Sequence, residues 1–118
     1  MKPRLKNIAV FIQSDPRASH RACEGIRIAL GLASSGHTVS VLLSGQGALV
    51  LSRDTDDFVD EDHLNKFLAV LNGFIPAFYL DETRVTKNTD LRIDYRTVWI
   101  SKKVLASKIT EAEVFFSF

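Results

Sequence analysis

Short apolar blocks alternate with polar segments along the chain, and several of these blocks have the length and composition of β-strands. They are rich in β-branched and aromatic residues, as strands are, and they cover residues 8–12, 39–43, 75–80, 97–100 and 113–118. The first block is apolar at every position, which is typical of a strand buried on both faces in a parallel sheet. These blocks therefore predict a sheet with a buried centre.

The segment after the first block has the three- and four-residue apolar spacing of an amphipathic helix. Ser19 is expected to be its N-cap, the helix is expected to run to Ser35, and Gly36 is expected to end it in a left-handed conformation. The side chains that would face the sheet are Ala22, Cys23, Ile26, Ala29, Leu30 and Ala33. One covering helix thus connects the first two strands.

Two further helices are expected later in the chain. One begins at Asp60 or Glu61 and ends at Gly73, and the other covers 102–109 with Ser101 as its cap. Strands that alternate with helices predict an α/β fold. We expect a doubly wound, three-layer α/β/α architecture with about five mostly parallel strands.

The composition is that of a globular domain. The chain has 118 residues, of which 46% are hydrophobic and 25% charged, so we expect a single domain over residues 1–118. Its net charge of +1 argues against nucleic-acid binding, which needs clustered cations. No apolar stretch reaches the length of a membrane span, so no membrane partner is expected. Cys23 is the single cysteine, which makes the cytoplasm the default location.

Candidate chemistry lies at the carboxyl ends of the predicted strands, where ligands bind in open α/β sheets. The loops at 13–19, 44–47 and 81–84 follow the first three strands and are expected to form this edge. The polar side chains that we expect in a ligand site there are Ser14, Asp15, Ser44, Gln46, Asp81 and Glu82.

No motif for a metal, a cofactor or a catalytic group accompanies these residues. The segment 45–47 lacks the third glycine of a dinucleotide motif and the lysine of a phosphate loop. The acidic run at 54–62 lacks the glycine and glutamate that a calcium loop requires. Ser19 and His20 are adjacent in a helical segment, so their side chains point apart. We therefore expect no catalytic residue, no metal and no cofactor, and whether the isolated chain is an enzyme stays open, with the balance against it.

A characteristic order of segments runs through the chain. An apolar strand is followed by Ser14-Asp15-Pro16, the helical segment 22–33, Gly36-His37, a second strand and Gly45-Gln46-Gly47, and an apolar strand closes the chain. This order resembles the DsrE/DsrF-like family, which includes the small subunits of bacterial sulfur-relay complexes. The resemblance covers nearly the whole chain. It implies an α/β fold and cytoplasmic assemblies of like subunits, often dimers, trimers or hexamers.

The resemblance also implies where sulfur would be carried, and the chain departs from the family at that point. Active members have a cysteine at the end of the third long strand that carries sulfur as a persulfide. Leu80 or Asp81 stands there in this sequence, and neither side chain can carry sulfur. Cys23 lies on the sheet-facing stripe of the first helix, so we expect it to be buried and unreactive. Our leading hypothesis is a non-carrier DsrE/DsrF-like subunit, a structural or docking component of a sulfur-relay-type assembly.

Two alternatives remain open at this point. The first is a small-ligand-binding protein or an enzyme that uses the strand-end crevice. The second is a receiver-like phospho-acceptor domain, in which Asp15 and Asp81 would hold Mg²⁺ and Lys102 would serve as the accompanying lysine. Receivers usually pair two acids after the first strand, whereas only Asp15 is present there.

An apolar stripe on the first helix predicts a protein–protein contact. Ile28 and Leu32 point away from the expected sheet-facing stripe, where a covering helix normally carries charge. Phe115, Phe116 and Phe118 are expected to add apolar surface at the end of the chain. We therefore expect a homo-oligomer, or a hetero-oligomer with related subunits, with Ile28 and Leu32 in its interface.

Overall fold

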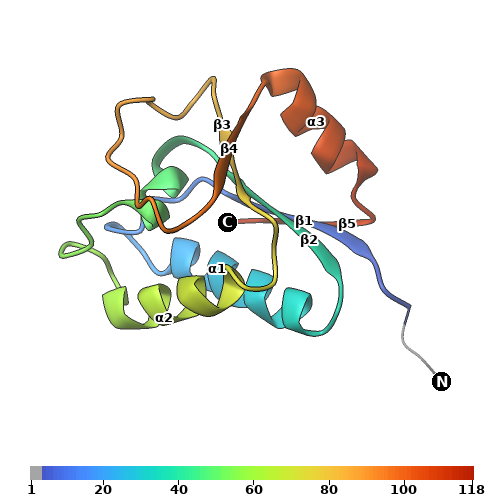
Figure 1. Cartoon of the computed structure of the whole chain (residues 1–118), viewed down its shortest axis with the longest axis horizontal. Helices are drawn as coiled ribbons and strands as arrows, with labels where there is room; N and C mark the ends of the chain where they lie inside the picture. Colours follow the sequence, from blue (N-terminus) through green and yellow to red (C-terminus); the bar gives the residue numbers. More distant parts are fainter. Residues whose placement is uncertain (1–3) are drawn as a thin grey trace.

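A parallel five-stranded sheet forms the centre of the computed structural model, which describes residues 4–118 (Figure 1). The strands lie in the order β4-β3-β2-β1-β5, and all their pairings are parallel. Their bounds are β1 Asn7–Ile12, β2 Thr38–Leu43, β3 Phe78–Asp81, β4 Thr97–Ile100 and β5 Val114–Ser117. The predicted α/β class with a mostly parallel sheet is therefore confirmed.

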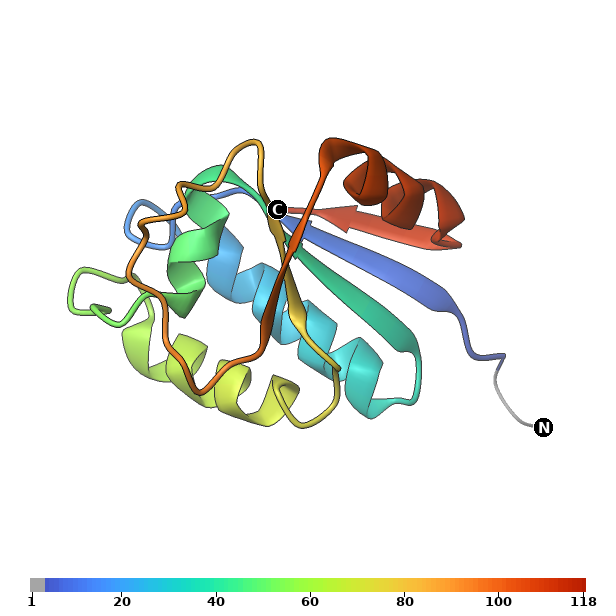
Figure 2. The ribbon, with the colours of Figure 1, turned by 45° about the horizontal axis from the view of Figure 1, so that its top comes forward.

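Helices cover both faces of the sheet, which gives three layers (Figure 2). The helices α1 (Arg21–Ser34) and α2 (Glu61–Leu71) lie on one face with the 3₁₀ helix η1 (Gly45–Leu51), and α3 (Lys102–Glu111) lies on the other. The order of the strands explains this division. From β1 to β4, each strand is added on the same side of the one before it, whereas β5 lies at the opposite edge of the sheet, beside β1. Because both kinds of crossover are right-handed, connections that run in opposite directions lie on opposite faces of the sheet.

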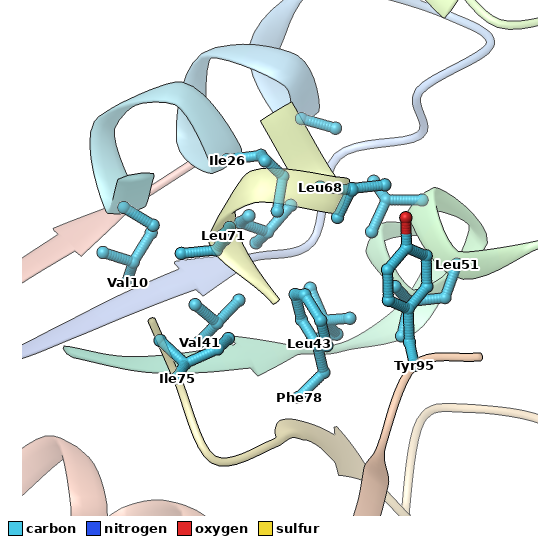
Figure 3. Packing of buried hydrophobic residues seen from close by; sticks show 14 of the residues in the cluster. Val10, Ile26, Val41, Leu43, Leu51, Leu68, Leu71, Ile75, Phe78 and Tyr95 are labelled. Atoms are coloured by element: carbon cyan, nitrogen blue, oxygen red, sulfur yellow. The ribbon is translucent and has the colours of Figure 1, made fainter. Parts of the chain in front are cut away.

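The larger core lies between the sheet and the pair α1 and α2. Ile26 of α1 and Leu68 of α2 meet Val41 of β2 and Phe78 of β3 there, and all four are fully buried (Figure 3). Burial of each such side chain contributes about 1.5–3 kcal/mol. A smaller cluster, centred on Leu42, packs under α3. Two buried faces explain why the central strands are apolar at almost every position.

The first helix begins later than the capping pattern predicts. It starts at Arg21, with His20 in the N-cap position and no capping bond from the His20 side chain. The Ser19 hydroxyl accepts a hydrogen bond from the backbone N–H of Arg21 at 3.3 Å, so Ser19 stabilises the preceding turn and not the helix. The expected end is confirmed, because Gly36 adopts a φ of 97° directly after the last turn.

The third strand begins at Phe78 and not at residue 75. Pro76 has no N–H group, so it cannot take part in a central strand. The N–H of Phe78 donates to the carbonyl of Arg96 at 2.9 Å, where the pairing with the β4 segment starts. Ile75 is nevertheless buried, which explains why its segment has the hydropathy of a strand.

The other two helices agree with their predicted bounds. The helix α2 begins at Glu61 and ends at Leu71, just before Gly73. The helix α3 extends two residues past 109 to Glu111, and the Ser101 hydroxyl accepts from the N–H of Val104 at 3.2 Å as its cap. None of the helices within residues 4–118 combines the length and the apolar character that crossing a membrane requires.

Candidate functional site

The carboxyl ends of β3 and β4 form a topological switch point. The segment that leaves β3 runs on the α1 and α2 face, where Val85 and Tyr95 join the larger core, whereas the segment that leaves β4 forms α3 on the opposite face. Adjacent strands whose connections diverge in this way leave a crevice between them, the usual ligand site of open α/β sheets. A cleft of about 500 Å³ opens there. Its lining residues are Phe11, Ser44, Asp81, Thr83, Arg84, Lys102 and Leu105.

Asp81 is the centre of the polar part of this cleft. It is the last residue of β3 and only 3% exposed. Its Oδ2 accepts a hydrogen bond from the Ser44 hydroxyl at 2.9 Å. Its Oδ1 accepts from the Thr83 hydroxyl at 2.6 Å and from the Thr83 backbone N–H at 3.1 Å. Both oxygens of the buried carboxylate are therefore supplied with donors from this chain.

These donors keep Asp81 charged. Burial alone would raise the pKa of this carboxyl, because it disfavours the ionised form. The hydrogen bonds from Thr83 and Ser44 favour the ionised form more strongly, and the positive charge of Arg84 adds to them, so the pKa of Asp81 lies below its ordinary value. At neutral pH the cleft consequently contains a buried, hydrogen-bonded carboxylate.

Two cationic side chains and an apolar wall complete the cleft. Arg84 comes from the turn after β3, and Lys102 is the first residue of α3. No ion pair joins either cation to another residue in the part of the chain that the structure describes. Phe11 of β1 and Leu105 of α3 provide apolar surface beside them. The lining thus combines charged and apolar side chains, as the lining of small-molecule sites does.

Ser44 and Asp81 are the two predicted site residues that meet in this cleft. Asp15 is engaged by Arg17 instead, whose guanidinium lies 2.9 Å from Oδ2 of Asp15. Ser14 follows β1, and its backbone N–H donates a hydrogen bond to the carbonyl oxygen of Phe118 at 3.3 Å. Gln46 and Glu82, by contrast, are exposed to solvent. These four side chains do not line the cleft.

Thr83 and Arg84 line the cleft without having been singled out from the sequence, and Lys102 was considered only for a receiver-like site. A local signal for Thr83 does exist, because an aspartate often binds the N–H two residues later in an Asx turn. A local signal also exists for Lys102, because the cap Ser101 places Lys102 in the first turn of α3, directly after β4. Neither signal reveals which strands are neighbours, so the convergence of these residues depends on the strand order.

Comparison with solved structures gives the fold type. Over 97% of this chain and 100% of the other, the structure superposes on the ychN protein from E. coli with a TM-score of 0.73 and 16% sequence identity. That protein has a DsrE/DsrF-like fold. This chain shares that fold. At this level of identity the similarity establishes the architecture alone, and it supports the predicted resemblance at that level. No family model matches the sequence, and no curated protein is similar to it.

The cysteine of this DsrE/DsrF-like fold lies away from the strand-end cleft. Cys23 is 6% exposed and packs in the larger core, on the α1 and α2 face of the sheet, as predicted. Burial raises the pKa of its thiol, and the nearby charges of Asp60 and Glu24 raise it further. A buried thiol with a raised pKa is a poor nucleophile. Within residues 4–118, no group of three or more His, Cys, Asp or Glu side chains is placed to hold a metal ion.

The predicted interface residues lie beside the edge strand β5. Ile28 and Leu32 line a shallow apolar pocket of about 280 Å³ together with Phe116 of β5. Leu32 also packs partly against the larger core, so it does not point fully outward as expected from the helix pattern. Gly25 of the same helix packs against the sheet, because a Cβ there would lie 2.9 Å from the side chain of Ile12.

Proposed function

We propose that this chain is a non-carrier subunit of the DsrE/DsrF-like type, which acts as a structural or docking component of a cytoplasmic assembly of like or related subunits. The observation that carries this proposal is the residue at the end of β3. Asp81 occupies that position as a buried carboxylate with both oxygens hydrogen-bonded. Its oxygens cannot form a persulfide. The one thiol, Cys23, lies across the sheet from the cleft and is buried.

A sulfur-loading experiment tests the non-carrier role. In a sulfur carrier, a thiolate attacks an S–S bond of inorganic polysulfide, takes one sulfur atom and releases a shortened polysulfide. Native protein treated in this way is expected to show no added sulfur by intact mass spectrometry, because Cys23 is buried with a raised pKa. Sulfur added to Cys23 in the folded wild-type protein would contradict the proposal.

A matched variant shows whether the cleft itself could carry sulfur. The substitution Asp81→Cys in a Cys23→Ala background places the only thiol at the end of β3. Cys23 packs in the larger core, whereas position 81 lines the cleft together with Arg84 and Lys102. Cations favour the thiolate, so we expect this variant to take up one sulfur atom. The Cys23→Ala protein is the control and is expected to take up none. Equal uptake by both proteins would mean that the assay does not report on this position.

The assembly role is tested at the apolar pocket beside β5. We expect Ile28→Lys to shift the protein toward monomer in sedimentation velocity, because it places a charge among Leu32 and Phe116. Ile28 is the better position to change, since Leu32 also contributes to the core. Val104→Lys is the matched control, because Val104 is an exposed apolar residue on α3 at 42%. A wild-type protein that sediments as a monomer at micromolar concentration would exclude the homo-oligomer.

Ligand binding in the strand-end cleft is a second candidate function. The observation that favours it is a cleft of about 500 Å³ at the β3 and β4 switch point, lined by both polar and apolar side chains. A ligand selective for the folded protein would raise its melting temperature. Mutation of Arg84 or Lys102 would reduce that shift if the ligand occupies this cleft.

The geometry does not favour the receiver-like alternative. Receiver domains have the strand order 2-1-3-4-5, whereas this sheet has the order β4-β3-β2-β1-β5. Asp15, the proposed partner of Asp81 for Mg²⁺, forms hydrogen bonds with Arg17 and does not line the cleft. Two acids that face one cation are therefore not brought together at this edge of the sheet.

A further inference from the structure

We propose that the strand-end cleft binds a small organic anion, with the anionic group held by Arg84 and Lys102 and the apolar part packed on Phe11 and Leu105. This inference deepens the second candidate function and rests on it, because it names the class of ligand. It is independent of the assembly role.

The carboxylate in the cleft is not free to bind a cationic ligand. Each Asp81 oxygen already accepts a hydrogen bond from a hydroxyl group, one from Ser44 and one from Thr83. Ser44 is completely buried, so its hydroxyl has no access to solvent as an alternative partner. Asp81 itself is only 3% exposed, so a ligand in the cleft can reach little of its carboxylate. Asp81 therefore acts as an internal anchor for the turn and not as a ligand for a metal or an amine.

The charges on the cleft lining are unbalanced in favour of an anion. The ionisable lining residues are one acid, Asp81, and two bases, Arg84 and Lys102, which leaves one positive charge. In contrast to these two bases, Arg17 has a carboxylate 2.9 Å away and Arg27 has one 2.7 Å away. Two unpaired cations from different elements, converging on one cleft, are suited to a carboxylate or phosphate group.

The remaining lining sets the size and the polarity of the ligand. A volume of about 500 Å³ lies within the range of small-molecule sites. Phe11 of β1 and Leu105 of α3 belong to the smaller core cluster under α3, so they offer a firm apolar surface next to the cations. An anion with an apolar body would use both parts, whereas inorganic phosphate would use only the cations.

Four probes distinguish these features by ¹H–¹⁵N NMR titration of the wild-type protein. Benzoate and phenyl phosphate carry an anionic group on an aromatic body, benzamidine carries a cationic group on the same body, and inorganic phosphate has no body. We expect benzoate and phenyl phosphate to shift the amides of Thr83, Arg84 and Lys102 saturably, with phosphate weaker and benzamidine inactive. Binding of benzamidine with equal affinity in this cleft would overturn the anion inference while leaving ligand binding intact.

Matched variants locate the site. Arg84→Gln and Lys102→Gln are each expected to weaken the better anionic probe about tenfold or more, because each removes a charge-assisted hydrogen bond. Lys103→Gln removes the same charge from a neighbouring exposed residue that does not line the cleft, and it is expected to have little effect. Equal weakening by all three variants would overturn the proposal, since it would indicate general electrostatic attraction. Absence of saturable shifts with either aromatic anion would overturn it together with the second candidate function, and the assembly role would be unaffected.

Discussion

Asp15 and Asp81 begin the same local turn at two different places in the molecule. Asp15 follows β1 and Asp81 is the last residue of β3. Each accepts a hydrogen bond through Oδ1 from the backbone N–H two residues later, at 2.9 Å from Arg17 and 3.1 Å from Thr83. Their remaining partners differ. The Arg17 guanidinium pairs with Asp15 in a half-exposed position, whereas two hydroxyl groups bond Asp81 in a buried one.

The difference determines what each carboxylate does to its surroundings. The side-chain hydrogen bond from Arg17 is the main reason why the pKa of Asp15 lies below its ordinary value, and the guanidinium also cancels the charge. Ser44 and Thr83 lower the pKa of Asp81 against the effect of burial, but neutral hydroxyls leave its negative charge in place. The end of β3 thus keeps a buried charge at the cleft, and the end of β1 does not. Similar turns at two strand ends therefore lead to a carboxylate paired with a guanidinium near β1 and a buried carboxylate in the cleft at β3.

The largest expected effect comes from disturbing the contact between the β1 and β2 ends. Gly47 of η1 packs so closely there that a Cβ would lie 2.1 Å from the carbonyl oxygen of Ile12. We expect Gly47→Ala to destabilise the fold by about 3 kcal/mol, because backbone must move to admit the methyl group. Gly31→Ala is the control, since nothing lies within 4 Å of its Cβ position. That variant is expected to gain about 0.5–1 kcal/mol by helix propensity. Urea unfolding measures both changes.

Removing the buried carboxylate is expected to have the next largest effect. Asp81→Ala leaves the buried Ser44 hydroxyl without its acceptor, and we expect a loss of about 2 kcal/mol. Asp81→Asn keeps one carbonyl oxygen and should lose less. Asp15→Ala is the matched comparison at the other strand end, and its loss should stay below about 1 kcal/mol, because its partner is exposed. Equal losses at the two positions would remove the distinction between the two turns.

The elements that the sequence predicts well are those whose burial and pairing coincide. The first two strands are apolar and also paired along their whole length, so hydropathy places them correctly. The third departs from this rule. Ile75 is buried without pairing in the sheet, and the apolar pattern therefore begins before the strand does. Hydropathy reports burial and not hydrogen bonding, which is why the start of this strand could not be predicted.

The candidate site shows a similar division between local and long-range information. Ser44 and Asp81 could be placed at strand ends because each comes at the end of an apolar run. Lys102 was placed beside Asp81 only in the receiver-like alternative, because its position depends on β4 lying next to β3 and on α3 covering the opposite face. In the same way, Asp15 lies in the loop after β1, but the polarity of that loop does not say which neighbour will bind its carboxylate. Strand order and the choice of partner are properties of the folded chain.

The pKa values of Asp15 and Asp81 should respond differently to salt. The folded-state pKa of both groups lies below the ordinary value of about 3.9. Each therefore stabilises the fold above that value, and this contribution is lost as the pH falls from there through the folded-state pKa. We expect high salt to raise the pKa of Asp15, because salt screens its partly exposed pair with Arg17. The pKa of Asp81 should change less, since hydroxyl donors hold it. NMR titration of the side-chain carboxyl carbons at low and high salt measures both, and equal salt shifts would contradict this account.

The smallest expected effect is that of removing the Arg17 side chain. Arg17→Ala eliminates the guanidinium but keeps the backbone N–H that bonds Asp15 at 2.9 Å, so the turn itself should remain. Because the pair is partly exposed, we expect the stability loss to be too small to resolve by urea unfolding. The pKa of Asp15 should rise only part of the way to its ordinary value, since the backbone hydrogen bond still favours the ionised form. The pKa of Asp81 should not change, because its donors belong to Ser44 and Thr83. A shift in the pKa of Asp81 in this variant would mean that the two strand ends are electrostatically coupled. The different pKa behaviour of Asp15 and Asp81 could then not be explained by their local hydrogen-bond partners alone.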